Sequence, residues 1–540
     1  MIEFDYKLPS MKAGGKKNGQ YNNPEMVLPF MLTTTDYRLG EFLHVLHNTV
    51  ADERRLLFVD GRVIACCHNW MRDHVHMMKA FRHWEYDMKS FLQYIIDTQN
   101  DEGYFYELVK QLDDPHWQFV DDDCRIIYPD DNVALVRLEL EADIEYLVVE
   151  GVWQYYRTTG DFDWVTSVLP RLEKAINYMT SSPKRWNKEY GLVVRPFTID
   201  TWDFTNDQRS QTDRRIHDDE PMCIMHGDNS GVYEAMNILA TFNDKLGNAE
   251  KADEWRRRAE TLKENMFKYL WNGKFFIHQL HIDNGAIDDK ENVRLSLSNG
   301  YDINRGVTTL AQSRSIIEEY MERRKTTKAF AEWFSIDPPY DNFKGFPPGR
   351  YVNGSISPFT AGEIALAAFK NGYEEYGWNI IARFIDIAEE DKRICFLYSP
   401  LDRGAQNATG PSGWGSAALL NAVDEGLCGV VDRDCLYREI DFSPRFPVCP
   451  YKELRYVTGY ELSHKFVDVR YVIKDEGMRY DVYSEAEKIN FHVLLPKGKT
   501  CEKLLVDGKT TEFKTVGVGD STYVDFSCAP RGRVSTEILF

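Results

Sequence analysis

The sequence predicts an all-α toroid of paired helices, an (α/α)6 barrel, followed by a small C-terminal antiparallel β domain. Two observations carry this prediction: apolar residues recur at helical spacing from about residue 70 to 425, and short β-rich runs replace them after about residue 430. A chain of 540 residues also exceeds the about 250–300 residues that one ordinary core supports, a limit that a toroid can pass. We expect an N-terminal extension at 1–60, the toroid at 61–430 and the β domain at 431–540.

Apolar stripes locate the helices of the toroid. They run through residues 140–155, 169–179, 232–242 and 255–270, with a further stripe at 381–388. Short connections, such as the one that contains Gly247, make successive helices antiparallel, and the pattern accommodates about ten to twelve paired helices. A helical solenoid is the rival architecture. A solenoid predicts one repeating sequence period, which this chain lacks.

The segments outside the helices divide into two kinds. Long irregular stretches at 101–138, 181–225 and 271–306 interrupt the helical pattern, and loops of that length in a compact domain usually carry function. The C-terminal part instead contains strand-like runs bounded by Gly, Asp and Pro. These runs are RYVIKDEGMRYDVYS, INFHVLLP, KLLVDGK and STYVDFSC.

Composition excludes several classes of function. The net charge of −20 argues against a nucleic-acid partner, which clustered Lys and Arg would hold. We expect no membrane span, because 18 apolar residues never follow one another, and no signal peptide, so that a cytoplasmic location is the default. Scattered cysteines without a C-x-x-C pair argue against structural zinc, and we expect no metal or cofactor. The 12 Trp, 30 Tyr and 30 Phe suit either a large aromatic core or a sugar-binding cleft.

The segment NWMRDHVHMMKAF at 69–81 is the first candidate for a site. Trp70 precedes Arg72 and Asp73 at the start of a predicted helix. Neighbouring Arg and Asp side chains can donate to and accept from two vicinal sugar hydroxyls. The alternative is an Asp that caps the helix beside a solvated Arg.

The segment RPFTIDTWDFTNDQ at 195–208 is the second candidate. It places Asp200 and Asp203 around Trp202 in one of the long loops. A carboxylic acid in an aromatic setting can hold its proton and protonate a glycosidic oxygen. The alternatives are acids that form a turn or bind calcium.

A Gly-rich loop, DRGAQNATGPSGWGSAALL, is the third candidate. It begins with Asp402 and ends at Trp414, where an apolar helix starts. Trp414 is either a wall of a cleft or the buried residue of a connection.

Together these motifs resemble the six-hairpin glycosidase superfamily. The resemblance rests on W-x-R-D, D-x-W-acid and T-G-P-x-x-W-x-x-A-A-L in this order, and covers most of 60–430. The first motif is similar to the sugar-binding segment of glucoamylases, which implies that Trp70, Arg72 and Asp73 bind the sugar. Both the glucoamylase pattern and the W-D-F segment of trehalases imply that Asp203 is the general acid, with Asp200 beside it and Trp202 and Trp414 as walls.

The general base is where this chain departs from the resemblance. Glucoamylases place it in an A-E-Q segment, and this chain has Ala405 at that position, which cannot take a proton. Asp402 in a shortened loop and Glu363 in a helical stretch are the candidates to replace it. Phosphate as nucleophile would remove the need for a base.

We therefore predict an exo-acting, inverting glycoside hydrolase whose substrate is an oligosaccharide or glycoside. Asp203 and Asp402 are the predicted catalytic residues. The predicted substrate-binding residues are Trp70, Arg72, Asp73, Asp200, Trp202 and Trp414. An inverting phosphorylase on the same fold and a non-catalytic glycan-binding protein are the alternatives. A lyase would require a Tyr/His pair near an Arg cluster, which the sequence does not offer.

Overall fold

A computed structural model describes residues 32–113, 125–205, 214–282, 290–404, 411–530 and 532–540. Its centre is a succession of six helices in which each contacts the next and the last returns to the first. These inner helices are α2 (Met71–Phe81), α4 (Ile144–Thr159), α6 (His226–Lys245), α8 (Ser298–Asn304), α10 (Pro358–Lys370) and α12 (Gly413–Asn421).

A second set of helices packs outside the first. It comprises α1 (Tyr37–Ala51), α3 (Ser90–Asp97), α5 (Phe162–Met179), α7 (Ala249–Leu270), α9 (Leu310–Thr326) and α11 (Glu374–Asp391). The apolar stripes explain their faces: α7 buries Trp255, Leu262 and Met266 and exposes a mostly charged opposite side. Helix α5 begins after Asp161, whose side chain caps it by accepting a hydrogen bond from the Trp164 amide. The turn between α6 and α7 contains Gly247, whose φ of +77° suits glycine.

The prediction of an all-α catalytic domain is wrong, because strands occur throughout the helical part of the chain. They are β1 (Leu32–Thr34), β2 (Arg54–Val59), β3 (Arg62–Cys67), β4 (Leu108–Gln111), β5 (Arg125–Tyr128), β6 (Val133–Val136), β7 (Trp186–Asn187), β8 (Leu192–Val193), β9 (Arg195–Pro196), β10 (Met222–Met225), β11 (Gln279–His281), β12 (Leu295–Ser296) and β13 (Ile336–Asp337). Most have two to four residues, too few to show an alternating pattern, whereas β2 and β3 have six each and are joined by the turn Asp60–Gly61, a hairpin signal that the sequence analysis did not use. Apart from β1, they form small sheets that pair the backbone groups of the segments between helices.

The C-terminal sheets also differ from the predicted antiparallel domain. Their strands are β14 (Val430–Asp432), β15 (Glu439–Phe442), β16 (Glu453–Tyr460), β17 (Lys465–Lys474), β18 (Gly477–Ser484), β19 (Lys488–Leu494), β20 (Lys503–Val506), β21 (Lys509–Thr510), β22 (Lys514–Val518), β23 (Ser521–Cys528) and β24 (Gly532–Leu539). In the seven-stranded sheet the N-terminal strand β1 pairs with β16, and in the five-stranded sheet β15 and β19 run parallel. The sheets therefore include a strand from the other end of the chain, a pairing that local sequence does not reveal.

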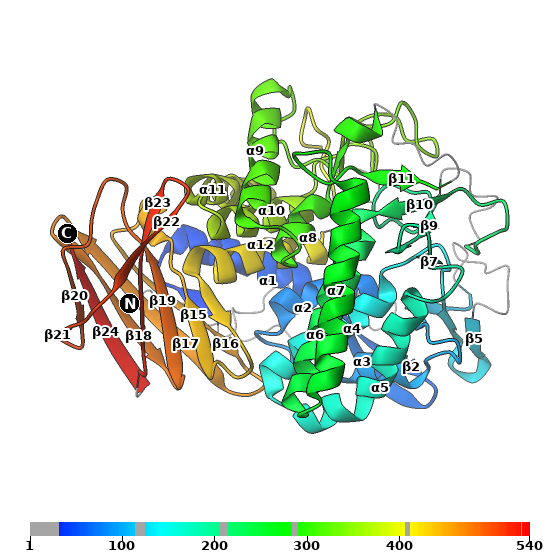
Figure 1. Ribbon diagram of the computed structural model, residues 1–540, viewed down its shortest axis with the longest axis horizontal. Helices are drawn as coiled ribbons and strands as arrows, with labels where there is room; N and C mark the ends of the chain where they lie inside the picture. The colour runs from blue at the N-terminus through cyan, green and yellow to red at the C-terminus, as the bar shows by residue number, and fades with distance from the viewer. Residues whose placement is uncertain (1–31, 114–124, 206–213, 283–289, 405–410, 531) are drawn as a thin grey trace.

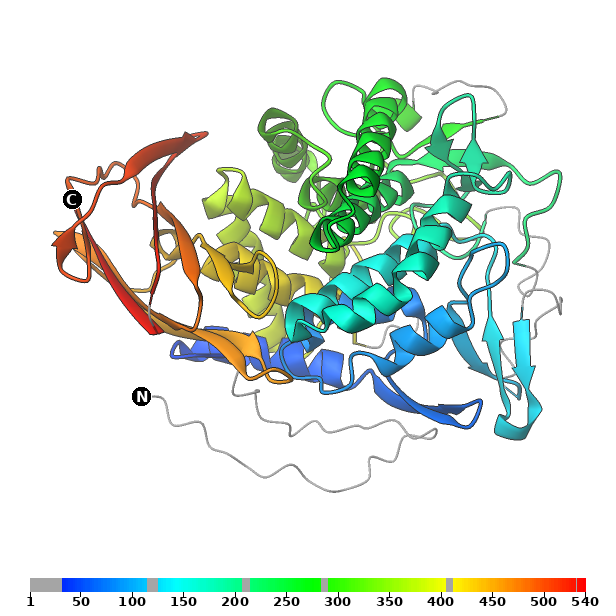
Figure 2. The same ribbon diagram turned by 60° about the horizontal axis from the view of Figure 1, so that its bottom comes forward.

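The arrangement of the layers is visible in two views. Strands β15–β24 lie at one end of the molecule, the helices in the middle, and the small sheets with β2, β5, β7 and β9–β11 at the other end (Figure 1). Figure 2 shows α1 beside the orange C-terminal strands, although about 400 residues separate them in sequence. Among the described helices, none has the length and apolar character that a bilayer crossing demands.

Candidate active site

A pocket of about 210 Å³ opens where inner helices begin. Its lining is His68, Trp70, Arg72, Asp73, Thr201, Trp202, Asp203, Leu297, Tyr351, Phe359, Phe396 and Trp414. The structure thus brings six of the residues singled out in the sequence into one cavity: the W-x-R-D triplet, Trp202 with Asp203, and Trp414. Because successive inner helices share an orientation, their first residues meet at one end of the molecule.

Trp414 forms one wall of the pocket and is held on both faces. Its ring stacks on His76 at a centroid distance of 4.3 Å and on Phe359 at 4.6 Å. Its indole N–H donates to the Tyr301 hydroxyl over 2.8 Å. These contacts fix Trp414 as a rigid wall, and because both faces of its ring are covered, it offers the cavity an edge and not a free face for stacking on a sugar.

Trp202 forms the opposite aromatic cluster. Tyr351 lies 5.0 Å and Phe396 5.6 Å from its ring centroid, and Phe204 stacks in turn on Tyr351. The backbone oxygen of Trp202 accepts from the guanidinium of Arg195 over 2.7 Å. The segment before Asp203 is therefore anchored by both packing and a hydrogen bond.

Two carboxyl groups, Asp73 and Asp203, line the pocket. Burial raises the pKa of Asp73 to about 6; Arg72 opposes this shift and the negative charge of Asp203 adds to it. Arg214 lies 3.5 Å from Oδ2 of Asp203 and also donates to its backbone oxygen. The pair therefore combines a carboxyl that holds its proton to unusually high pH with one that faces a cation.

Arg72 lines the pocket but is committed to buried acids behind it. Its Nε lies 2.5 Å from Asp143, and its Nη2 forms an ion pair with Glu141. Arg72 holds the pKa of Asp143 below its usual range against the effect of burial, whereas burial raises the pKa of Glu141 to about 7. This network fixes the guanidinium, which leaves it less free to bind sugar than the sequence suggests.

Asp200, predicted to bind substrate, does not line the pocket. Only 3% of it is exposed, and its carboxylate accepts from the Ser298 hydroxyl at 2.5 Å and from the Ser298 amide at 3.2 Å. Its own amide donates to Nε2 of His278, and its φ is +47°. The geometry makes Asp200 the anchor of the loop that presents Asp203.

The candidates for the general base lie elsewhere. Asp402 is exposed outside the pocket and accepts from the Gly404 amide in its own turn. Glu363 is buried, 2.8 Å from Lys79 and 2.7 Å from the Asn304 amide group. Neither belongs to the pocket lining. Ala405 lies outside the described residues.

Several lining residues escaped the sequence analysis. Tyr351 and Phe396 come from segments without a motif, Phe359 lies in the first turn of α10 at the end of the segment VNGSISPF, which also resembles the six-hairpin glycosidase superfamily, and His68 precedes a motif. The signal that could have indicated these aromatic walls is the clustering of aromatic residues in the segments between predicted helices. Within the described ranges, no three His, Cys, Asp or Glu side chains gather as metal ligands.

Comparisons with known proteins bear on the family resemblance and on the fold. The profile of the trehalase family matches residues 200–333, less than half of the chain, beginning with the segment that contains Asp203. The chain resembles the six-hairpin glycosidases. This confirms the resemblance predicted from the W-D-F segment, without specifying a family within the superfamily. A search of curated proteins gave no match.

Solved structures of six-hairpin glycosidases have a similar fold. The α-L-rhamnosidase from Dictyoglumus thermophilum aligns with a TM-score of 0.58 at 13% identity, over 94% of this chain and 50% of that one. The rhamnosidase of Bacillus sp. GL1 gives 0.58 at 14%, over 87% and 43%, and that of Streptomyces avermitilis 0.57 at 11%, over 94% and 42%. The chain thus spans half or less of these enzymes, and identities this low establish likeness of fold alone.

Proposed function

We propose that this six-hairpin, glycosidase-like chain is a glycoside hydrolase that cleaves its substrate in the pocket between Trp202 and Trp414. The observation that carries the proposal is the presence of Asp73 and Asp203 in one small cavity with aromatic walls. Glycosidases use paired carboxyls at the scissile bond, and aromatic walls exclude water and stack on the apolar faces of sugars.

In the proposed mechanism, Asp203 donates a proton to the glycosidic oxygen as the bond to the anomeric carbon breaks. Water attacks the anomeric carbon from the opposite face and gives its proton to a carboxylate that acts as general base on that face, so the product has inverted configuration. Asp73 accepts a hydrogen bond from a hydroxyl of the sugar that is cleaved off. Arg72 keeps Asp73 and the acids behind it in place. The assignment of the donor rests on the resemblance at Trp202–Phe204.

The small volume of the pocket supports exo action on a single terminal sugar. A cavity of about 210 Å³ lies below the range of about 300–1,000 Å³ typical of sites that enclose a whole ligand. Terminal α-L-rhamnose and the glucose unit of trehalose are the first sugars to test, because the similar proteins are rhamnosidases and a trehalase family.

The test compares Asp203→Asn with Asp73→Asn on two substrates of the same sugar. One carries a leaving group that needs protonation, such as an alkoxide, and the other carries 2,4-dinitrophenolate, which does not. Asp203→Asn should lower turnover about 10²–10⁴-fold on the first and much less on the second. If Asp73→Asn shows this dependence instead, the proton donor is Asp73.

The same assay separates hydrolysis from the alternative activities. Product should form without phosphate, and proton NMR of its first-formed anomer should show inversion. If sugar 1-phosphate is released, and only when phosphate is added, the protein is a phosphorylase and not a hydrolase. If the protein binds an oligosaccharide saturably but forms no product, it is a non-catalytic glycan-binding protein.

A further inference from the structure

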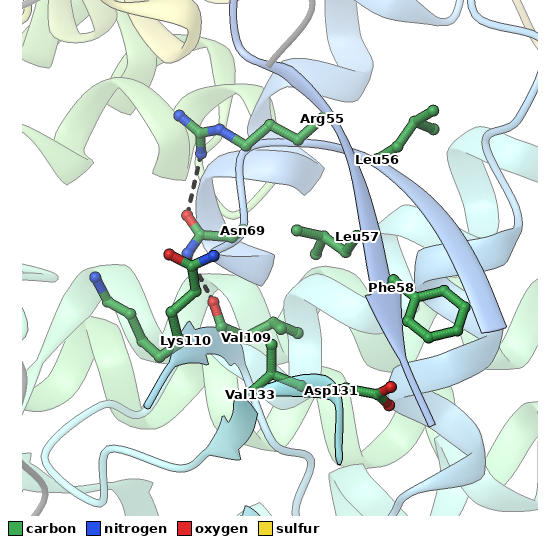
Figure 3. A pocket seen from close by; sticks show the side chains of 10 residues that line it. Arg55, Leu56, Leu57, Phe58, Asn69, Val109, Lys110, Asp131 and Val133 are labelled. Carbon is green, nitrogen blue, oxygen red and sulfur yellow. Dashed lines mark hydrogen bonds between the residues drawn. The ribbon is translucent and has the colours of Figure 1, made fainter. Parts of the chain in front are cut away.

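A second cavity, of about 360 Å³, lies beside the pocket and has no role in the proposed mechanism. It is lined by residues 55–58 of β2, Asn69, residues 109–111 of β4, Asp131 and Val133 (Figure 3). We call it the hairpin groove, because the β2–β3 hairpin forms one side of it.

The floor of the hairpin groove is aliphatic. In Figure 3, Leu57 projects from β2 toward the side where Asn69, Val109 and Val133 lie, whereas Leu56 and Phe58 project the other way. Asn69 is fixed in place: it accepts from Arg55 over 3.1 Å and donates to the Val109 carbonyl over 2.7 Å. Charged and amide groups remain at the rim, which gives an apolar floor with polar edges.

The groove adjoins the pocket through one short segment. His68 and Trp70 line the pocket, and Asn69 between them lines the groove. The Val109 amide donates to the Asn69 carbonyl over 3.2 Å, so β4 runs along this segment. Burial lowers the pKa of His68 to about 4; Glu53 opposes this shift, and Arg55 and Lys110 add to it.

The two cavities differ in the chemistry that they suit. Aromatic walls and carboxyls in the pocket match a sugar ring, whereas the floor made by Leu57, Val109 and Val133 matches an aliphatic or aryl group. The pocket is smaller than sites that typically enclose a whole ligand, so a large group beyond the scissile bond would extend outside it. The groove is the adjacent space.

We propose that the hairpin groove binds an apolar aglycone, so that the preferred substrates are glycosides of alkyl or aryl alcohols rather than oligosaccharides. This inference rests on the proposed function, since it assigns the leaving-group side of the same site.

The experiment measures kcat/KM for methyl, butyl, hexyl and octyl glycosides of the sugar that the enzyme cleaves, below their critical micelle concentrations. In the wild type, kcat/KM should rise about fourfold for each methylene that the groove buries, the factor for about 0.8 kcal/mol. In the Leu57→Gln variant, kcat/KM should depend much less on the length of the alkyl chain. The isosteric Val133→Thr, which preserves the volume of a buried residue, should reduce its slope.

Val63→Gln is the matched control. Val63 lies on the same hairpin, is 63% exposed and does not line the groove, so its variant should keep the wild-type slope. A wild-type series without dependence on chain length overturns the groove assignment and leaves the proposed function standing. Absence of hydrolysis with every glycoside overturns the proposed function and the groove with it. Equal flattening by Val63→Gln and Leu57→Gln would also refute the assignment.

Discussion

The link between Asp200 and Ser298 gives the sharpest test of how this chain positions Asp203. Ser298 is the first residue of α8, and its hydroxyl and amide both donate to the Asp200 carboxylate. Three residues after Asp200, the chain reaches Asp203. Ser298→Ala removes the shorter of these two hydrogen bonds and leaves the other in place, so the fold should survive.

The size of the effect follows from burial. Both side chains are at most 3% exposed, so the lost hydrogen bond to a charged group should reduce the free energy of unfolding by about 1.5–3 kcal/mol. If the loop shifts by about 1 Å, turnover should fall about 100-fold. Asp200→Ala should cost more, because it removes both bonds and places Ala at a φ of +47°.

The assay is kcat/KM of Ser298→Ala on the alkyl and dinitrophenyl glycosides used for Asp203. A displaced proton donor harms only the leaving group that needs a proton, so the loss should be larger on the alkyl glycoside. Urea denaturation of the same variant measures the change in the free energy of unfolding. An equal loss on both substrates would show that Ser298 serves stability alone and would refute the positioning argument.

Four further predictions concern the three residues Asp73, Gly227 and Asp402. Ionised Asp73 accepts a stronger hydrogen bond from a sugar hydroxyl than protonated Asp73 does, so kcat/KM should rise as pH rises through about 6, and Asp73→Asn should remove this dependence; a rise that persists in the variant would assign it to another group. Its raised pKa also means that its contribution to stability declines as pH rises from 3.8, the unfolded value, to about 6, which denaturation of the wild type and Asp73→Asn across this range would show. Gly227→Ala should destabilise the protein by about 1–3 kcal/mol in urea denaturation, because the added Cβ collides with the Ser298 hydroxyl; unchanged stability would mean that the loop relaxes freely. Asp402→Ala should retain full activity, because Asp402 is exposed outside the pocket. If the variant instead loses activity and azide restores it, Asp402 is the general base.

The parts that the sequence predicts well are those with a local signal. The stripe through Trp255 and Met266 matches the buried face of α7, and Asp203 lies in the pocket beside Trp202. Most of the short strands were missed because two to four residues carry too little pattern, although the Asp60–Gly61 turn between β2 and β3 was a usable signal, and the pairing of β1 with β16 joins distant segments. Asp200 was misplaced for a related reason: residue type reveals an acid, whereas its partner Ser298 lies 98 positions away.

The charges around the pocket limit what kind of sugar it can accept. Arg72 is the cation in contact with the cavity from α2, but its charge is balanced by Glu141 and Asp143 directly behind it. Asp73 and Asp203 then dominate the lining, in a chain whose net charge is already −20. Among the described residues, Arg214 faces Asp203 and Arg72 is paired with Glu141 and Asp143, so a uronic acid would bring a third carboxylate against cations that are already engaged, at a cost of several kcal/mol. The electrostatics of the pocket therefore favour a neutral sugar and select against acidic ones.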